Sequence, residues 1–142
     1  MDEKELLRTV PLFSELSDAD ITSLGRLASR RRYPKDTVVF FENEEGDFFF
    51  MIVEGRIKVT ILGDDGREII LSMLGPGDFF GEMALLVHGP RTATIVTTSP
   101  TSVRAFHRSE FDSLLEQSPK VAVKILRTTA ERLLRAEDSP HH

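Results

Sequence analysis

Residues 79–94 read FFGEMALLVHGPRTAT, and this stretch guides the interpretation of the whole chain. Gly81 has no Cβ atom, so the backbone can come close to another group there. If a short helical turn begins at Gly81, its backbone N–H groups converge on one spot and favour an anion. Arg91 follows Glu82 by nine residues, and its planar guanidinium fits phosphate oxygens bidentately.

Glu82 adds a second function to this anion site. Its carboxylate repels a phosphate, but it can accept a hydrogen bond from a sugar hydroxyl. Taken singly, Gly81 is consistent with a bulge, and Glu82 and Arg91 with solvated charges, because charged side chains are mostly exposed. Together, within a largely apolar segment, the three residues predict a sugar-phosphate site.

The composition limits the classes of function. The 142 residues suit one domain, and the net charge of −5 makes direct nucleic-acid binding a poor interpretation. The absence of cysteine excludes disulfides, cysteine zinc sites and cysteine-ligated iron–sulfur clusters. There is no run of eighteen apolar residues, and the first residues are charged, so we expect neither a membrane span nor a signal peptide. A cytoplasmic protein is expected.

The hydrophobic pattern predicts short strands in the middle and helices at both ends. The predicted strands cover residues 37–41, 48–53, 57–61, 68–74, 92–98 and 101–107. The predicted helices cover residues 3–9 and 18–29, a segment capped by Ser109, and Pro119 to about Asp138. Arg30, Arg31 and Arg32 are expected to form a solvated cluster at a helix end. The fold class is mainly β, an antiparallel jelly-roll-like β-roll.

The same residues carry a family resemblance. FGEMALLVHGPRTAT resembles the phosphate-binding cassette of cyclic-nucleotide-binding domains, the family of the bacterial catabolite activator and of the regulatory subunits of cyclic-nucleotide-dependent kinases. The Gly-Glu pair, Ala84, the Glu-to-Arg spacing and Pro-Arg-Thr-Ala carry it. YPKDTVVF, Gly46-Asp47 and IVEGRIKV extend the similarity over roughly residues 10–137. The resemblance implies about eight strands with N-terminal helices and a long C-terminal helix.

The resemblance also assigns the site. Phosphate would be bound by Arg91, the Thr92 hydroxyl and the backbone N–H groups of Ala84 and Ala93. Ribose would be bound by Glu82, with Gly81 allowing close approach. The base would lie against Val59, Leu71, Ser72 and Leu74 and be capped by Arg132. No catalytic residue, metal or cofactor is expected, because neither His88 nor His107 has metal-ligand spacing.

The expected ligand is cyclic AMP, or else cyclic GMP. Bacterial members of the family mostly use cyclic AMP, whereas Thr92 is compatible with both nucleotides. Ala136 and Glu137 stand where the catabolite activator has two hydroxyl residues, so base contact from that part of the helix is left open. The alternatives are a member that senses another ligand and a module that only dimerises.

The last helix is expected to transmit the signal. A seam at 4-3-4-3 spacing predicts a homodimer, although the same face could instead pack on the β-roll. The seam consists of Ala122, Leu126, Thr129, Leu133 and Ala136. We expect residues 1–118 to form the sensor, residues 119–138 the transducer helix and residues 139–142 a tag remnant. DNA would be reached only through a further domain of a transcriptional regulator or another signalling protein.

Overall fold

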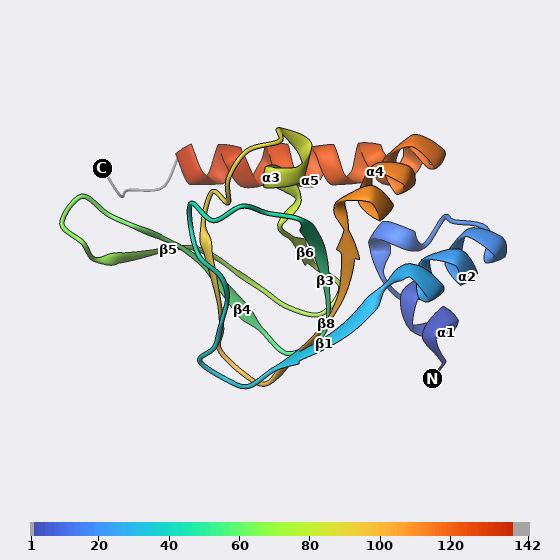
Figure 1. The fold of residues 1–142 in the computed structure, drawn as a ribbon, viewed down its shortest axis with the longest axis horizontal. Coiled ribbons are helices and arrows are strands. Elements are labelled where there is room, and N and C mark those ends of the chain that lie inside the picture. The colour runs from blue at the N-terminus through green and yellow to red at the C-terminus, as the bar shows by residue number, and fades with distance from the viewer. Residues whose placement is uncertain (1, 138–142) are drawn as a thin grey trace.

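A β-roll lies at the centre of the computed structural model, which describes residues 2–137, and helix α5 runs along one side of it (Figure 1). The helices are α1 (Glu3–Arg8), η1 (Pro11–Phe13), α2 (Asp18–Leu27), α3 (Glu82–Leu86), α4 (Arg108–Gln117) and α5 (Pro119–Glu137). The strands are β1 (Ser29–Tyr33), β2 (Val38–Phe40), β3 (Phe48–Glu54), β4 (Ile57–Leu62), β5 (Glu68–Leu74), β6 (Phe79–Phe80), β7 (Thr94–Thr97) and β8 (Thr101–His107).

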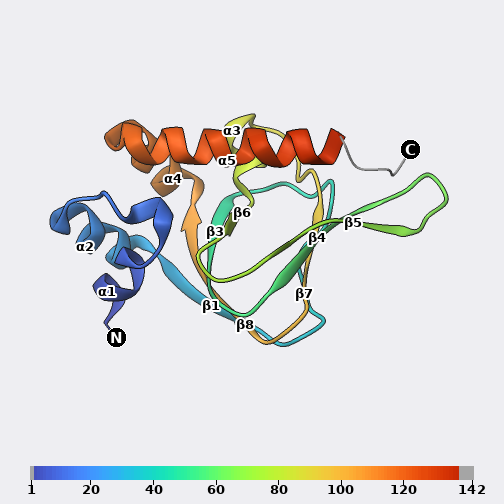
Figure 2. The ribbon, with the colours of Figure 1, turned by 180° about the vertical axis from the view of Figure 1, so that it is seen from behind.

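Two four-stranded antiparallel sheets form the roll, which confirms the predicted fold class. Their strand orders are β1-β8-β3-β6 and β2-β7-β4-β5. Side chains from both sheets fill the interior, among them Phe50, Ile52, Ile57 and Ile95. The β4–β5 hairpin extends away from the body and projects beyond the C-terminal end of α5 (Figure 2).

Strand β3 is buried on both faces, which explains its continuous apolar sequence. Successive side chains of a strand point to opposite faces. Phe50 and Ile52 therefore enter the roll, while Phe49 and Met51 enter a second core made with the helices. This second core joins α1, α2, α4 and the first half of α5, including Ile125, to the outer face of one sheet. The start of α5 is thereby fixed against the roll.

The predicted helix over residues 18–29 ends earlier, and the expected basic cluster at its end is wrong. Residues 30–32 lie in β1, which pairs with β8 from Ser29↔Ala105 to Tyr33↔Thr101. Three consecutive arginines show no alternation of apolar and polar residues, so the pattern hid the strand. β1 is an edge strand, where charged side chains prevent pairing with another chain. The two-residue strand β6 was also missed, since it is too short to show a period.

The predicted cap of α4 is wrong by two residues. His107 is the N-cap, and its side chain accepts a hydrogen bond from the Ser109 backbone N–H at 3.3 Å. Glu110 Oε2 accepts one in return from the His107 backbone N–H at 2.9 Å, which completes a capping box. Histidine is not among the residues that N-caps prefer, so the sequence pattern favours Ser109 instead.

The long helix α5 is confirmed, but one member of its predicted seam points elsewhere. Thr129 is buried, and its hydroxyl bonds to Glu82. The large apolar side chains that α5 exposes are Val123, Leu126, Leu133 and Leu134. Asp138, the proposed tag remnant over residues 139–142 and the side chain of Ala136 lie outside the described part of the structure.

Candidate functional site

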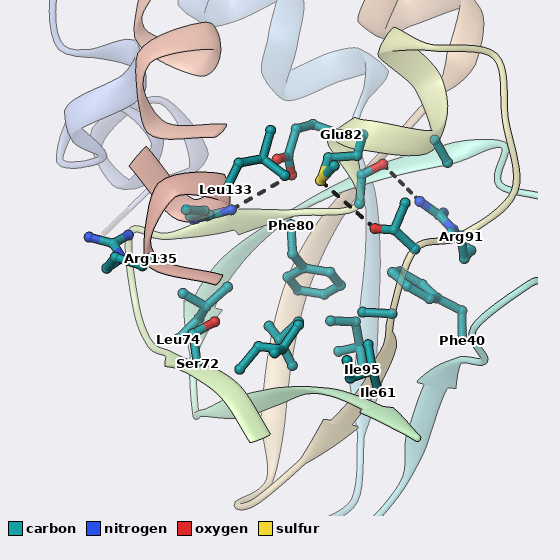
Figure 3. Close-up of a pocket in the computed structure, with 18 residues that line it drawn as sticks. Phe40, Ile61, Ser72, Leu74, Phe80, Glu82, Arg91, Ile95, Leu133 and Arg135 are labelled. Carbon is teal, nitrogen blue, oxygen red and sulfur yellow. Dashed lines mark hydrogen bonds and ion pairs between the residues drawn. The ribbon is translucent and has the colours of Figure 1, made fainter. Parts of the chain in front are cut away.

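A cavity of about 290 Å³ lies between the β2-β7-β4-β5 sheet, the segment after β6 and the C-terminal half of α5 (Figure 3). All eleven residues that the sequence singled out line it: Val59, Leu71, Ser72, Leu74, Gly81, Glu82, Ala84, Arg91, Thr92, Ala93 and Arg132. They come from β4, β5, the cassette and α5, which are distant in sequence. The structure brings the residues together; the contact expected of each with a ligand stays a prediction.

Arg91 forms one end of the cavity. It is 4% exposed, and its Nη1 and Nη2 atoms donate to the backbone oxygens of Gly81 and Phe48, each at 2.7 Å. Its Cζ atom lies 3.9 Å from the ring centroid of Phe40, and its buried Nε has no partner among the described residues. A guanidinium has five N–H donors, so these two bonds leave three for an anion.

The electrostatics keep this end cationic. Burial lowers the pKa of Arg91 to about 10, an effect that the nearby carboxylates of Asp47 and Glu82 oppose. At neutral pH the guanidinium is therefore still charged. A buried cation without a full counter-charge is costly, and a bound anion would relieve that cost.

Two glycines make room for the Arg91 side chain. Gly81 has φ 85°, and a Cβ atom there would lie 2.9 Å from Arg91 Nη1. A Cβ atom on Gly46 would lie 2.6 Å from Arg91 Nε. Gly46 was noted only as part of the family pattern, because a sequence does not show which backbone a distant side chain crosses.

Glu82 joins the cassette to α5. Its carboxylate is buried at the start of α3, where it accepts a hydrogen bond from the Thr129 hydroxyl at 2.7 Å. Arg132 Nη1 lies 3.6 Å from the other carboxylate oxygen, and the Arg132 guanidinium covers the Phe79 ring at 4.6 Å. Burial lowers the pKa of Arg132, and Glu82 opposes that shift. Arg132, expected at the base, thus has Glu82 as its ion-pair partner.

Seven further residues line the cavity that the sequence analysis did not assign to the site; one of them, Leu133, was expected only in the dimer seam. They are Phe40, Ile61, Phe80, Met83, Ile95, Leu133 and Arg135. The sequence contains a signal that could have found Arg135, since this residue follows Arg132 by three positions and so shares its helix face. Ile61 likewise follows Val59 by two residues on one strand. Phe40 and Ile95 lie on β2 and β7, whose pairing creates this wall, and that pairing is not evident from sequence.

The family is settled by comparison with known proteins. A family model described as the cyclic nucleotide-binding domain matches residues 30–118. The chain belongs to this family. The match includes the cassette, Glu82 and Arg91, and it begins at the strand β1 that sequence patterning missed.

Named relatives differ in what they do. A CRP-like cAMP-activated global transcriptional regulator of Mycobacterium tuberculosis is 30% identical over 95% of this chain and 60% of its own length. A cyclic nucleotide-gated potassium channel of Rhizobium etli is 37% identical over 90% of this chain and 34% of its own length. The crystal structure of the Thermus thermophilus catabolite activator protein is 31% identical, with a TM-score of 0.80 over 89% of this chain and 60% of its own. The chain thus spans about 60% or less of these relatives.

The described residues offer no metal centre. Between residues 2 and 137, no group of three or more His, Cys, Asp and Glu side chains is placed to hold a metal ion. Within the same range, no helix combines the length and apolarity that a membrane span requires.

Proposed function

We propose that this chain binds a 3′,5′-cyclic purine nucleotide, with cyclic AMP preferred over cyclic GMP. The observation that carries the proposal is the pairing of Arg91 and Glu82, a buried cation with unused donors and a buried carboxylate, in one largely apolar cavity. A cyclic nucleotide has one phosphate charge, sugar hydroxyls and an apolar base face. Each of these features has a counterpart in the cavity.

We infer the binding mode from the family resemblance, and the positions of these groups in one cavity support it. The phosphate would contact the Arg91 guanidinium, the Thr92 hydroxyl and the backbone N–H groups of Ala84 and Ala93. The ribose 2′-hydroxyl would donate to Glu82, in exchange for the hydrogen bond from Thr129 or the ion pair with Arg132 that the carboxylate now makes. The base would extend along the apolar wall, which includes Val59, Leu71 and Leu74, with Ser72 and Arg132 at its edge.

The preference for cyclic AMP rests on the relatives. The mycobacterial relative is named as activated by cyclic AMP, and a relative from Thermus thermophilus, 31% identical over 89% of this chain, is named a cyclic AMP receptor protein. Thr92 is compatible with either purine. Calorimetric titration of cyclic AMP, cyclic GMP and 5′-AMP into the protein tests the proposal. We expect the tightest binding for cyclic AMP and the weakest for 5′-AMP, because its extra negative charge would be repelled by the Glu82 carboxylate in the same cavity. A member with another ligand, or a module that binds none, would bind neither cyclic nucleotide.

The role of the chain is that of a sensor rather than an enzyme. We infer that a soluble, cytoplasmic regulator carries it, and that nucleotide binding shifts the position of α5 through Glu82. In this reading, residues 1–118 form the sensor and residues 119–138 the transducer helix. DNA contact would belong to another domain. Incubation with cyclic AMP and divalent metal followed by chromatography is expected to return the nucleotide unchanged; any hydrolysis product would contradict the sensor role.

A homodimer through α5 is part of this proposal. Leu126, Leu133 and Leu134 are 55%, 46% and 62% exposed, which is a costly surface unless a second copy covers it. Leu126→Glu is expected to convert a dimer to a monomer in sedimentation velocity, while Leu62→Glu, an equally apolar exposed site on the β4–β5 hairpin, leaves it dimeric. A wild-type protein that sediments as a monomer at high concentration would exclude this part of the proposal.

A further inference from the structure

Arg108, the first residue of α4, connects two loops that meet at Arg91. Its Nη2 atom donates to the backbone oxygen of Gly46 at 2.6 Å, and its Nη1 atom donates to His88 Nδ1 at 3.1 Å. Its backbone N–H also donates to the Asp47 carbonyl at 2.7 Å. Arg108 is not among the residues that line the cavity, so it has no direct part in the site.

The loop that Arg108 holds lies directly against the Arg91 guanidinium. Gly46 approaches so closely that a Cβ atom would lie 2.6 Å from Arg91 Nε and 2.7 Å from its Cζ. The backbone of Arg91 exchanges hydrogen bonds with the same loop, since its N–H donates to Glu44 and its carbonyl accepts from Asn43, both at 2.8 Å. The position of Gly46 therefore limits where the guanidinium can lie.

His88 ties Arg108 to the cassette itself. It lies between α3 and Arg91 with φ 52°, a left-handed conformation that histidine, asparagine and aspartate tolerate better than other side chains. To accept from Arg108, Nδ1 must carry no proton. Arg108 therefore connects the turn that carries His88 to the loop that carries Gly46.

We propose that Arg108 is a positioning residue for Arg91, through its bonds to the Gly46 carbonyl and to His88. The proposal rests on the proposed function, in which Arg91 binds the phosphate. It adds a residue outside the cavity to that site.

Other charged groups surround the pair, and the test must separate them. The loop carries Glu44, Glu45 and Asp47, of which Asp47 Oδ1 lies 3.9 Å from Arg108 Nε. The cassette contributes Arg91, and α4 contributes Glu110 and its N-cap His107.

The first experiment measures the dissociation constant of cyclic AMP. Arg108→Ala is expected to weaken binding about tenfold, because a charge-assisted hydrogen bond to the loop is lost. Arg108→Lys keeps the charge but not the fork, so it recovers only part of this loss. His88→Asn places Oδ1 where Nδ1 was and tolerates the backbone conformation. It keeps the acceptor for Arg108 and should bind as the wild type does.

A matched control separates positioning from the stability of α4. Glu110→Ala removes the capping box without touching Gly46, so it lowers the melting temperature but leaves the dissociation constant unchanged. The proposal is wrong if Arg108→Ala binds as tightly as the wild type, or if Glu110→Ala weakens binding equally.

A second readout needs no nucleotide. The Nε–H proton of Arg91 is buried, so its ¹⁵N-resolved NMR signal should exchange slowly with water in the free protein at about pH 8. Arg108→Ala should speed that exchange, and Arg67→Ala, on the exposed hairpin, should not. If no cyclic nucleotide binds but the exchange still depends on Arg108, the proposed function fails and the positioning role stands. Equal exchange in all variants would overturn the positioning role alone.

Discussion

The two ends of the cavity are built from different parts of the molecule. Arg91 lies at one end, held by backbone oxygens, two glycines and the ring of Phe40, all from the β-roll and the cassette. Arg135 lies at the opposite end and is exposed, on helix α5 (Figure 3). Several neighbouring groups fix the position of Arg91, whereas the position of Arg135 depends on where helix α5 lies.

Because of this difference, we expect the affinity for the nucleotide and the change in the position of α5 to depend on different residues. A charge held in a fixed, water-poor place binds an anion strongly, while an exposed charge adds little. The two ends meet at Glu82, whose carboxylate accepts a hydrogen bond from Thr129 and forms an ion pair with Arg132, both on α5. A ligand that needs the Glu82 carboxylate would compete with those helix contacts. Affinity is therefore expected to come from the Arg91 end and the change in α5 from Glu82.

The largest expected effect comes from removing the fixed charge. Arg91→Ala should weaken cyclic AMP binding by about 2–5 kcal/mol, because a buried phosphate would lose its counter-charge. Calorimetric titration measures the change. Arg67→Ala, an exposed arginine on the hairpin, is the control and should bind as the wild type does. Equal loss in both variants would mean that net charge, rather than the site, attracts the nucleotide.

The next effect concerns the ribose. Glu82→Gln should weaken cyclic AMP binding about tenfold, because the 2′-hydroxyl loses a charged acceptor. Glu82→Gln and the wild-type protein should bind 2′-deoxy cyclic AMP about equally, because this nucleotide lacks the hydroxyl that would donate to Glu82. A double-mutant cycle over these four titrations measures the coupling. If the losses of binding free energy from the variant and from the 2′-deoxy nucleotide are additive, Glu82 does not contact the ribose.

A smaller effect is expected where the two ends meet. Thr129→Val removes the hydroxyl that bonds to Glu82 at 2.7 Å and leaves a buried carboxylate oxygen without that partner. The free energy of unfolding of the ligand-free protein should fall by about 1–2 kcal/mol in urea denaturation. Thr128→Val, the neighbouring half-buried threonine, is the matched control and should change stability little. The same stability in both variants would mean that the helix is held by its apolar contacts alone.

The smallest effect is expected at the exposed end. Arg135→Ala should weaken cyclic AMP binding by no more than about threefold, since solvent screens an exposed charge. Arg127→Ala, an exposed arginine of the same helix outside this cavity, provides the comparison. A loss at Arg135 as large as that at Arg91 would reverse the assignment of the two ends.

The sequence was informative where residue type and spacing carry the chemistry. Glu82 and Arg91 could be found because a glycine, an acid and an arginine at that spacing have few structural explanations in common. The roll could be found because strands with turn residues between them recur along the chain. The family resemblance then supplied the lining residues of β4 and β5, which no local pattern distinguishes from ordinary core.

The sequence was silent where the structure depends on pairing between distant segments. β1 carries three arginines and is a strand only because it pairs with β8. Phe40 and Gly46 contact Arg91 across the fold, and neither has a local signal for that role. Thr129 fitted a dimer seam by spacing, yet it faces Glu82, because helix spacing fixes a face but not the partner of each side chain.

The most direct test of the central claim is a crystal structure of the protein with cyclic AMP. The account predicts the phosphate within hydrogen-bond distance of the Arg91 guanidinium and the ribose 2′-oxygen on Glu82, with the base directed toward α5. A phosphate bound instead at the opposite end, against Arg132 and Arg135, or a nucleotide bound outside the cavity, would contradict it.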